Sequence, residues 1–326
     1  MLTILQRMPL ALTSFVALSC ANGVTDAVPL PDPIVIRRVD ACTVPPVPAA
    51  DAVTVLTDQP YATVDGRVLR FDLARPKVVT SPRPLVVLFH GGGFKSGNKN
   101  GLRSEIMTLA SLGYAAASVE YRLSSEPGYQ FPAPFSDARC ALRVLSTNAT
   151  GFLIDPARIA IGGTSAGAGL ALTVGMNSST ELDAALPAAA CDAGHAPLPT
   201  LQGIVSWYGG GDARNPALFG VGTAEALAQM LGGTPAEVPE RAALVSAVLH
   251  VDRLDPPTLH LHGTADAAVS IQQAVTLDAT MRAAGVPSLL VSLPGIGHAF
   301  EPLSADPVLQ SSTCSALQFL SDRLHP

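Results

Sequence analysis

Short apolar runs alternate with helical patterns along the chain from Val53 to the C-terminus. The run Pro84–Phe89 is apolar throughout, which is typical of a strand whose two faces are both buried. The predicted strands are Val53–Leu56, Val68–Leu73, Pro84–Phe89, Tyr114–Val119, Ile159–Ile161, Ile204–Trp207, Thr258–Leu261 and Ser288–Leu293. The predicted helices are Leu102–Leu112, Phe135–Leu145, Ala166–Gly175, Ala224–Leu231, Ile271–Ala284 and Ser312–Leu324. This alternation predicts an α/β fold with a mostly parallel central sheet and helices on both faces.

The predicted elements fall into a single domain over residues 53–326, because no internal repeat or second boundary interrupts them. Asp65-Gly66 predicts a turn that joins the first two strands as a hairpin. The segment Gly209–Leu254 contains irregular and helical pieces, and its length suits a small lid better than a full cap domain. Residues 22–52 are Pro-rich and lack periodicity, so we expect an extended N-terminal arm.

Residues 1–21 have the features of a secretory signal peptide. Arg7 precedes the apolar run Pro9–Leu18, and the small residues Ser19 and Ala21 follow that run. Two other interpretations stay open: a lipoprotein signal that anchors the chain through Cys20, and an apolar N-terminal helix of a cytosolic protein. We expect an exported protein, either secreted or periplasmic.

Four cysteines remain once Cys20 is assigned to the signal segment: Cys42, Cys140, Cys191 and Cys314. An even number of cysteines in an oxidising compartment favours disulfides over buried free thiols, so we expect at least one bridge. Four cysteines allow three pairings, and the sequence does not choose among them.

The composition argues against several classes of protein. Hydrophobic residues make up 48% of the 326 residues and charged residues 14%, which suits a large core and not a disordered chain. Acidic residues outnumber basic ones by 26 to 20 and no basic run occurs, so we expect no nucleic-acid partner. We expect no transmembrane span in the body of the chain. No metal-binding motif occurs, so neither a metal nor a cofactor is predicted.

The strongest chemical signal is the G-x-S-x-G motif at Gly163–Gly167. It stands between a predicted strand and a predicted helix, where such a motif forms a sharp, strained turn that exposes its serine. The N-terminus of the following helix favours developing negative charge beside Ser165. These features predict a nucleophilic serine.

A glycine-rich segment, His90–Phe94, directly follows the predicted strand Pro84–Phe89. Backbone amides on such a loop can face a substrate without side chains in the way, as stabilisation of a tetrahedral oxyanion requires. No G-K-[ST] follows and the spacing is not G-x-G-x-x-G, so phosphate binding is disfavoured.

Together these motifs resemble those of the serine esterases of the α/β-hydrolase superfamily. The resemblance is strongest to exported carboxylesterases and feruloyl or acetyl-xylan esterase-like proteins, which share features with the hormone-sensitive-lipase-like esterases. The D-P-L-type motif that usually carries the acid in the latter branch is absent, which favours the former. The resemblance runs in order from about Val53 to Leu324. The matching stretches are LVVLFHGGGFKSG, GYAAASVEYRL, FPAPFSDARCAL, DPARIAIGGTSAGAGLAL, LGGTPAEVPE, DPPTLHLHGTADAAVS and VPSLLVSLPGIGHAF.

The resemblance implies a catalytic triad of Ser165, Asp266 and His298, in the chain order serine, acid, histidine. His298 lies on a loop after the last predicted strand, where parallel sheets carry their chemistry. Asp266 lies in the G-x-x-D-x-x-V pattern that carries the acid in the family. Asp252 and Asp255 precede the neighbouring strand, so we expect them at the other end of the sheet.

The family's use of its second and third glycines and of the residue after the nucleophile implies an oxyanion hole. In this sequence those amides belong to Gly92, Gly93 and Ala166. Trp207 and Tyr208 end a predicted strand, and we expect them either to line the substrate pocket or to pack in the core.

These expectations describe a serine carboxylesterase that hydrolyses neutral esters, either of short-chain acids or linked to carbohydrates, through an acyl-enzyme on Ser165. A prolyl-oligopeptidase-like peptidase or amidase and an acyltransferase use the same triad. The alternative outside enzymes is a non-catalytic α/β-hydrolase that serves as a binding module. Specificity depends on loops, so the sequence leaves the ester substrate and the oligomeric state open.

Overall fold

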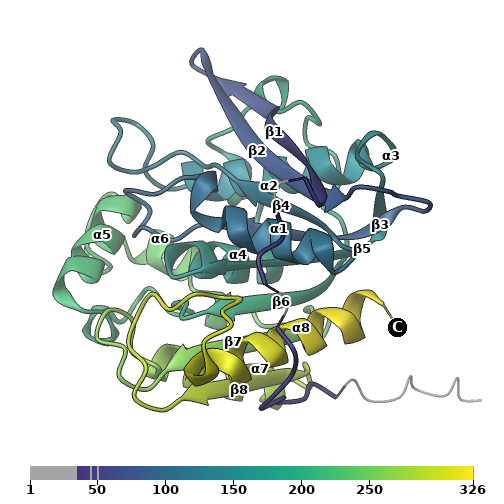
Figure 1. Ribbon diagram of the computed structural model, residues 1–326. Coiled ribbons are helices and arrows are strands. Elements are labelled where there is room, and N and C mark those ends of the chain that lie inside the picture. The colour runs from purple at the N-terminus through teal and green to yellow at the C-terminus, as the bar shows by residue number, and fades with distance from the viewer. Residues whose placement is uncertain (1–34, 45, 50, 326) are drawn as a thin grey trace, which may run out of the picture. The chain divides into compact units, whose positions relative to one another are not determined.

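An eight-stranded sheet with the order β1-β2-β4-β3-β5-β6-β7-β8 forms the centre of the structure (Figure 1). β1 pairs antiparallel with β2 and β2 with β4, and the other neighbours are parallel. The strands are β1 (Val53–Val64), β2 (Arg67–Pro76), β3 (Arg83–Phe89), β4 (Ala115–Val119), β5 (Ile154–Thr164), β6 (Leu201–Trp207), β7 (Thr258–Gly263) and β8 (Ser288–Leu293). This computed structural model describes residues 35–325 except 45 and 50. The predicted signal peptide and Cys20 therefore lie outside the described residues.

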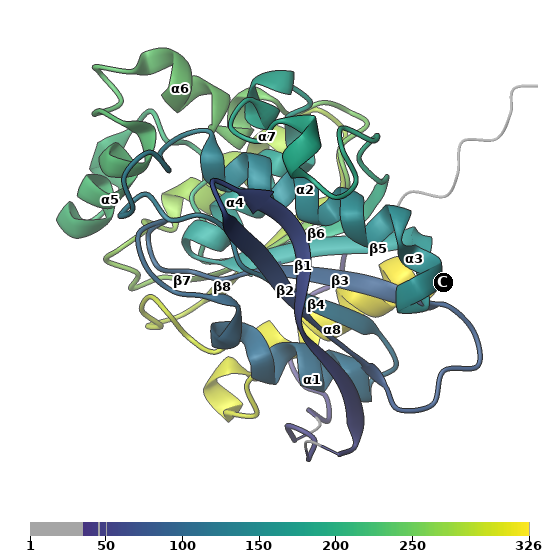
Figure 2. The ribbon, with the colours of Figure 1, turned by 90° about the horizontal axis from the view of Figure 1, so that it is seen from above.

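Helices cover both faces of the sheet, so the predicted α/β architecture is confirmed. α2, α4 and α7 pack on one face, and α1 and α8 pack on the other (Figure 2). The helices are α1 (Arg103–Ser111), α2 (Ala133–Thr147), α3 (Ala149–Phe152), α4 (Ala166–Met176), α5 (Val221–Leu231), α6 (Pro239–Leu244), α7 (Gln272–Ala283) and α8 (Gln310–Leu324). Within the described part of the chain, no helix has both the length and the apolar character needed to cross a membrane.

The central strand β3 shows why its sequence is apolar without interruption. Leu85, Val87 and Phe89 point into the core under α2 and α4. Val86 and Leu88 point into the opposite core under α1 and α8. Successive side chains of a strand alternate between faces, so a strand buried on both sides needs an apolar residue at each position.

The turn between β1 and β2 is the predicted one. Asp65 and Gly66 both have positive φ, 50° and 79°, as a tight hairpin turn of this type requires. The predicted strand ends are less accurate, because β1 continues through two register shifts beyond Leu56 and β5 already begins at Ile154. Irregular pairing of this kind interrupts the alternation of apolar and polar residues from which strands are predicted.

The segment Gly209–Leu254 forms α5, α6 and the 3-10 turns η4 (Pro216–Leu218) and η5 (Ala247–Leu249). α5 and α6 lie near each other at one end of the sheet in both ribbon views (Figures 1 and 2). This small helical cover agrees with the expected lid.

Two disulfides join parts of the chain that are distant in sequence, which confirms the expectation of at least one bridge. Cys42–Cys314 links the N-terminal arm to α8 across 272 positions, and Cys140–Cys191 links α2 to the segment after η3 (Ala188–Ala190) across 51 positions. Each bridge restricts the unfolded chain and so stabilises the folded state.

Replacing both cysteines of the first bridge, Cys42→Ser with Cys314→Ser, should lower the free energy of unfolding by about 2–4 kcal/mol, because the unfolded chain regains loop entropy. Urea unfolding under non-reducing conditions measures this loss. The comparison variant is Cys140→Ser with Cys191→Ser, which should lose less, because that bridge closes a loop of 51 positions and not 272. Identical unfolding midpoints for the wild-type protein with and without reductant would contradict both assignments.

Candidate active site

β5 and α4 meet at a sharp turn whose central residue is Ser165. Its backbone has φ 51° and ψ −117°, a conformation that is strained for residues other than glycine. Gly163 and Gly167, which flank Ser165, have no room for a side chain. A Cβ on Gly167 would lie 2.1 Å from the carbonyl oxygen of Phe89, and a Cβ on Gly163 would lie 2.5 Å from the carbonyl group of Gly167. The G-x-S-x-G spacing therefore allows the turn that presents Ser165 at the end of the sheet.

Ser165, His298 and Asp266 form one series of hydrogen bonds. Nε2 of His298 lies 2.8 Å from Oγ of Ser165, and Nδ1 of His298 lies 2.7 Å from Oδ2 of Asp266. Asp266 follows β7 and His298 follows β8, so the parallel strands place all three side chains at the same edge of the sheet. An imidazole that donates from Nδ1 to a carboxylate accepts at Nε2, as a general base must.

The side chain of Asp266 is fully buried and has four polar partners. Oδ1 accepts the amides of Ala268 at 2.9 Å and Val269 at 2.8 Å, while Oδ2 contacts His298 and lies 3.3 Å from Nε2 of His262. Burial by itself raises the pKa of a carboxyl group. Here the contacts with His262, His298 and the Val269 amide outweigh burial and hold the pKa of Asp266 below its ordinary value. Asp266 is therefore ionised and orients the imidazole of His298.

The glycine-rich loop after β3 lies beside Ser165. Gly92 and Gly93 have φ 118° and 62°, and a Cβ on Gly92 would lie 2.1 Å from the carbonyl oxygen of Ser96. Among the residues that the structure describes, the amides of Gly92, Gly93 and Ala166 donate to no protein acceptor. These three amides are therefore available as donors, and their use as an oxyanion hole stays a prediction from the family resemblance.

Two further histidines, His90 beside the glycine-rich loop and His260 within β7, are buried and neutral. His90 stacks on the ring of Tyr121 at a centroid distance of 4.3 Å, and its Nδ1 atom lies 2.7 Å from the carbonyl oxygen of Gly91. Burial lowers the pKa of His90 to about 4 and that of His260 to about 3. His90 thus holds the start of the glycine-rich loop. Within the described ranges, no group of three or more His, Cys, Asp or Glu side chains is placed to hold a metal ion.

A cavity of about 60 Å³ opens beside Ser165. Apolar side chains dominate its wall, which carries no charged residue, and the lid segment contributes much of it. The lining residues are Gly93, Phe94, Phe135, Ser165, Ala166, Gly169, Thr173, Gly210, Ala213, Phe219, Thr223, Leu227, Met230, Val245 and Val269. A small apolar group attached to a reacting carbonyl can occupy this space while the carbonyl lies at Ser165.

A family model described as BD-FAE matches residues 71–281, which is more than half of the chain and includes Gly92, Ser165 and Asp266. The chain belongs to the BD-FAE family.

Curated relatives of this BD-FAE chain include two proteins of Mycobacterium tuberculosis. Esterase LipC is 26% identical over 256 residues, which are 77% of this chain and 61% of the relative. The probable carboxylic ester hydrolase LipM is 28% identical over 257 residues, which are 74% of this chain and 55% of the relative. The BD-FAE chain thus spans less than two thirds of the length of either relative.

Solved structures similar to the BD-FAE chain are also esterases by name. A propionate-bound esterase of the Planctomycetes species Thermogutta terrifontis superposes with a TM-score of 0.67 at 24% identity, over 86% of this chain and 98% of that one. A truncated carbohydrate esterase from gut microbiota superposes with a TM-score of 0.67 at 26% identity, over 83% and 99%. The expected α/β-hydrolase fold is confirmed.

The two residues that end β6 and follow it do not line the cavity of this BD-FAE chain. Trp207 is 2% exposed and packs in the core, where a Cβ on Gly162 would lie 3.1 Å from the indole ring. The hydroxyl of Tyr208 donates to the carbonyl of Phe300 at 3.0 Å, and its ring meets the His298 ring edge-on at 4.8 Å. Of the two expected alternatives, Trp207 therefore follows core packing, and the ring of Tyr208 packs against the imidazole of His298.

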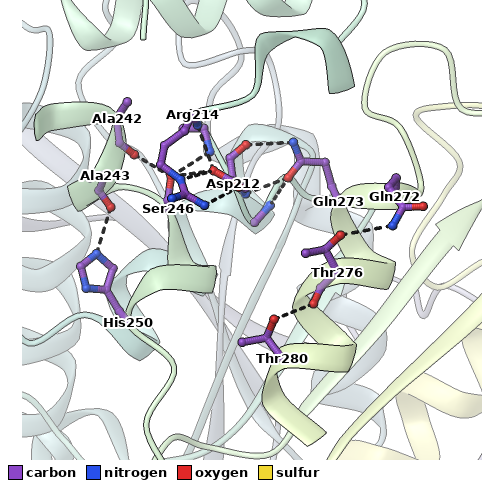
Figure 3. Close-up of polar contacts among 12 residues, drawn as sticks. Asp212, Arg214, Ala242, Ala243, Ser246, His250, Gln272, Gln273, Thr276 and Thr280 are labelled. Carbon is purple, nitrogen blue, oxygen red and sulfur yellow. Dashed lines mark hydrogen bonds and ion pairs between the residues drawn. The ribbon is translucent and has the colours of Figure 1, made fainter. Parts of the chain in front are cut away.

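Polar side chains that no motif marks, among them Ser246 and Gln273, hold the loop after β6 (Figure 3). This loop contributes Gly210 and Ala213 to the cavity wall. Oε1 of the buried Gln273 accepts two successive amides, including that of Asp212 at 2.7 Å, and its Nε2 donates to the carbonyl of Asp212 at 2.9 Å. Oγ of the buried Ser246 accepts the amide of Ala213 at 2.9 Å. α7 thus fixes a wall of the cavity from outside it.

The variant Gly92→Ala should lower kcat for p-nitrophenyl acetate by about 100- to 1,000-fold, the effect of losing one oxyanion donor. The new methyl group cannot fit against Ser96, so the loop must move its amides. Gly101→Ala is the matched control, because a Cβ there meets nothing within 4 Å. A kcat for Gly92→Ala within twofold of that of Gly101→Ala would contradict the assigned oxyanion loop.

Proposed function

We propose that this chain is a serine carboxylesterase that hydrolyses neutral esters of short acyl chains, with alcohol groups that include carbohydrate hydroxyls. The bonded series Ser165, His298 and Asp266 beside a small apolar cavity carries the proposal. Membership of the BD-FAE family and the likeness to named esterases support it.

The geometry accounts for a two-step acyl transfer. His298 takes the proton of Ser165 at Nε2 while Oγ bonds to the ester carbonyl carbon, and the carbonyl oxygen becomes an oxyanion. The amides of Gly92, Gly93 and Ala166 stabilise that oxyanion. His298 then returns the proton to the leaving alcohol, and the carbon–oxygen bond to the alcohol breaks. Water attacks the acyl-enzyme by the same route and releases the acid.

The size of the cavity supports short acyl chains. A buried water needs about 10–15 Å³ on the same measure of volume, so 60 Å³ suits a group of about four or five heavy atoms. Leu227 and Met230 of α5 and Phe135 of α2 bound this space. A longer chain must displace one of these side chains, which costs packing energy.

The uncharged wall supports neutral substrates, because a charged acyl group would lose its hydration without gaining an ion pair. The likeness to a carbohydrate esterase at 26% identity supports an alcohol that belongs to a carbohydrate. The two disulfides support export to an oxidising compartment.

We expect the purified protein to hydrolyse p-nitrophenyl esters fastest at acyl lengths of about four to six carbons, because the cavity holds about four or five heavy atoms beyond the carbonyl group. In Leu227→Ala the maximum should move to longer chains, since the wall loses most of a side chain that lines the cavity. The measurement is kcat/KM for each acyl length.

Leu249→Ala is the control for Leu227→Ala, because Leu249 is 47% exposed and does not line the cavity. Ser165→Ala should abolish hydrolysis at every chain length and leave the fold intact. Turnover by Ser165→Ala at the wild-type rate would overturn the proposed function. A length profile that Leu227→Ala leaves unchanged would overturn only the assignment of the cavity to the acyl group.

A further inference from the structure

His262 is the penultimate residue of β7, just before the loop that carries Asp266, and its side chain contacts that acid. Its side chain is 1% exposed. Nε2 of His262 lies 2.8 Å from the carbonyl oxygen of Val269 and 3.3 Å from Oδ2 of Asp266. That carboxylate oxygen is the one that also accepts from His298. Oδ2 of Asp266 is therefore shared by two imidazoles.

The contact with Val269 requires a proton on Nε2 of His262. A carbonyl oxygen can only accept, so Nε2 of His262 must carry a proton and donate it. The same N–H edge faces Oδ2 of Asp266 and favours the ionised carboxylate. A single N–H group of the ring therefore serves both acceptors.

Val269 connects this histidine to the other carboxylate oxygen. The amide of Val269 donates to Oδ1 of Asp266 at 2.8 Å, while its carbonyl accepts from His262. The side chain of Val269 lines the cavity beside Ser165. The amide of Val269 thus holds Oδ1 of Asp266. His262, which donates to the carbonyl of Val269, holds Oδ2.

We propose that His262 is a positioning residue for the reaction: its Nε2–H group holds the loop from Asp266 to Val269 so that the carboxylate faces His298. This inference rests on the proposed esterase function. His262 does not line the cavity beside Ser165 and acts through Asp266. Its loss should lower the rate of acyl transfer and leave substrate binding little changed, because the acid stabilises the imidazolium only during the reaction.

His260 provides a matched control on the same strand. It is buried to the same extent as His262, and alternation along β7 places both on the same face of the sheet. Nε2 of His260 has no hydrogen-bond partner among the described residues. Substitution of His260 therefore perturbs packing on the same face of β7 without removing a hydrogen bond to the catalytic acid.

The experiment compares His262→Asn, His262→Gln, His260→Asn and His260→Gln with the wild type, using a short-chain p-nitrophenyl ester and thermal melting. In His262→Gln the terminal amide reaches the position of Nε2 and keeps a donor there, whereas in His262→Asn it stops short. We expect His262→Asn to lower kcat by about 10- to 100-fold, the value of one hydrogen bond to a charged group, with KM changed by less than about threefold. We expect His262→Gln to stay within about threefold of the wild-type kcat, and both His260 variants within about twofold.

Three results would overturn the positioning role: a wild-type kcat in His262→Asn, an equal loss in His262→Gln and His262→Asn, or an equal loss in His260→Asn. If His262→Asn does not fold, His262→Gln decides, and a loss of about tenfold or more in kcat then contradicts the proposal. Ser165→Ala separates the two hypotheses. If it keeps wild-type hydrolysis, the proposed function fails, whereas an inactive Ser165→Ala beside an unaffected His262→Asn removes only the role of His262.

Discussion

A serine can hold φ 51° and ψ −117° only where the surrounding structure compensates for the strain, and the rest of this site depends on that turn. β5 is buried between β3 and β6, which fixes where the turn begins. Gly163 and Gly167 leave room for the neighbouring backbone at distances that no side chain would allow. The packing at the centre of the sheet thus maintains the strained backbone of Ser165. This conformation places Ser165 next to the amides at the start of α4 and on the loop after β3.

The parallel direction of the strands brings the remaining groups to the same place. The loops after β3, β5, β7 and β8 carry the glycine-rich segment, the serine, the acid and the histidine, although these residues are far apart in sequence. The lid segment then closes one side of the site with apolar side chains. Ser165 therefore lies at a cavity of about 60 Å³, with the imidazole of His298 hydrogen-bonded to it and the glycine-rich loop beside it.

The parts of this account that depend on local spacing could be predicted from the sequence. Gly163–Gly167 encodes its turn locally, Asp65-Gly66 encodes its hairpin, and the apolar run in β3 reports burial on both faces. The order of motifs also placed Asp266 and His298 on loops that the structure brings within hydrogen-bond distance of their partners.

The parts that depend on contacts distant in sequence could not be predicted. Trp207 ends a strand as a pocket residue would, but its side chain points into the core, and which face a strand end presents follows only from the register with β5. Spacing does not choose among the three cysteine pairings. Gln273 and His262 contact backbone groups of other loops, so no motif marks them.

The central claim is that Ser165 is the nucleophile of a complete triad. Stoichiometric reaction with paraoxon, followed by peptide mapping, tests it most directly. The account predicts one diethylphosphoryl group per chain, on Ser165, with ester hydrolysis lost in proportion to labelling and no labelling of Ser165→Ala. Labelling at another residue, or full hydrolysis after Ser165 is labelled, would contradict the account.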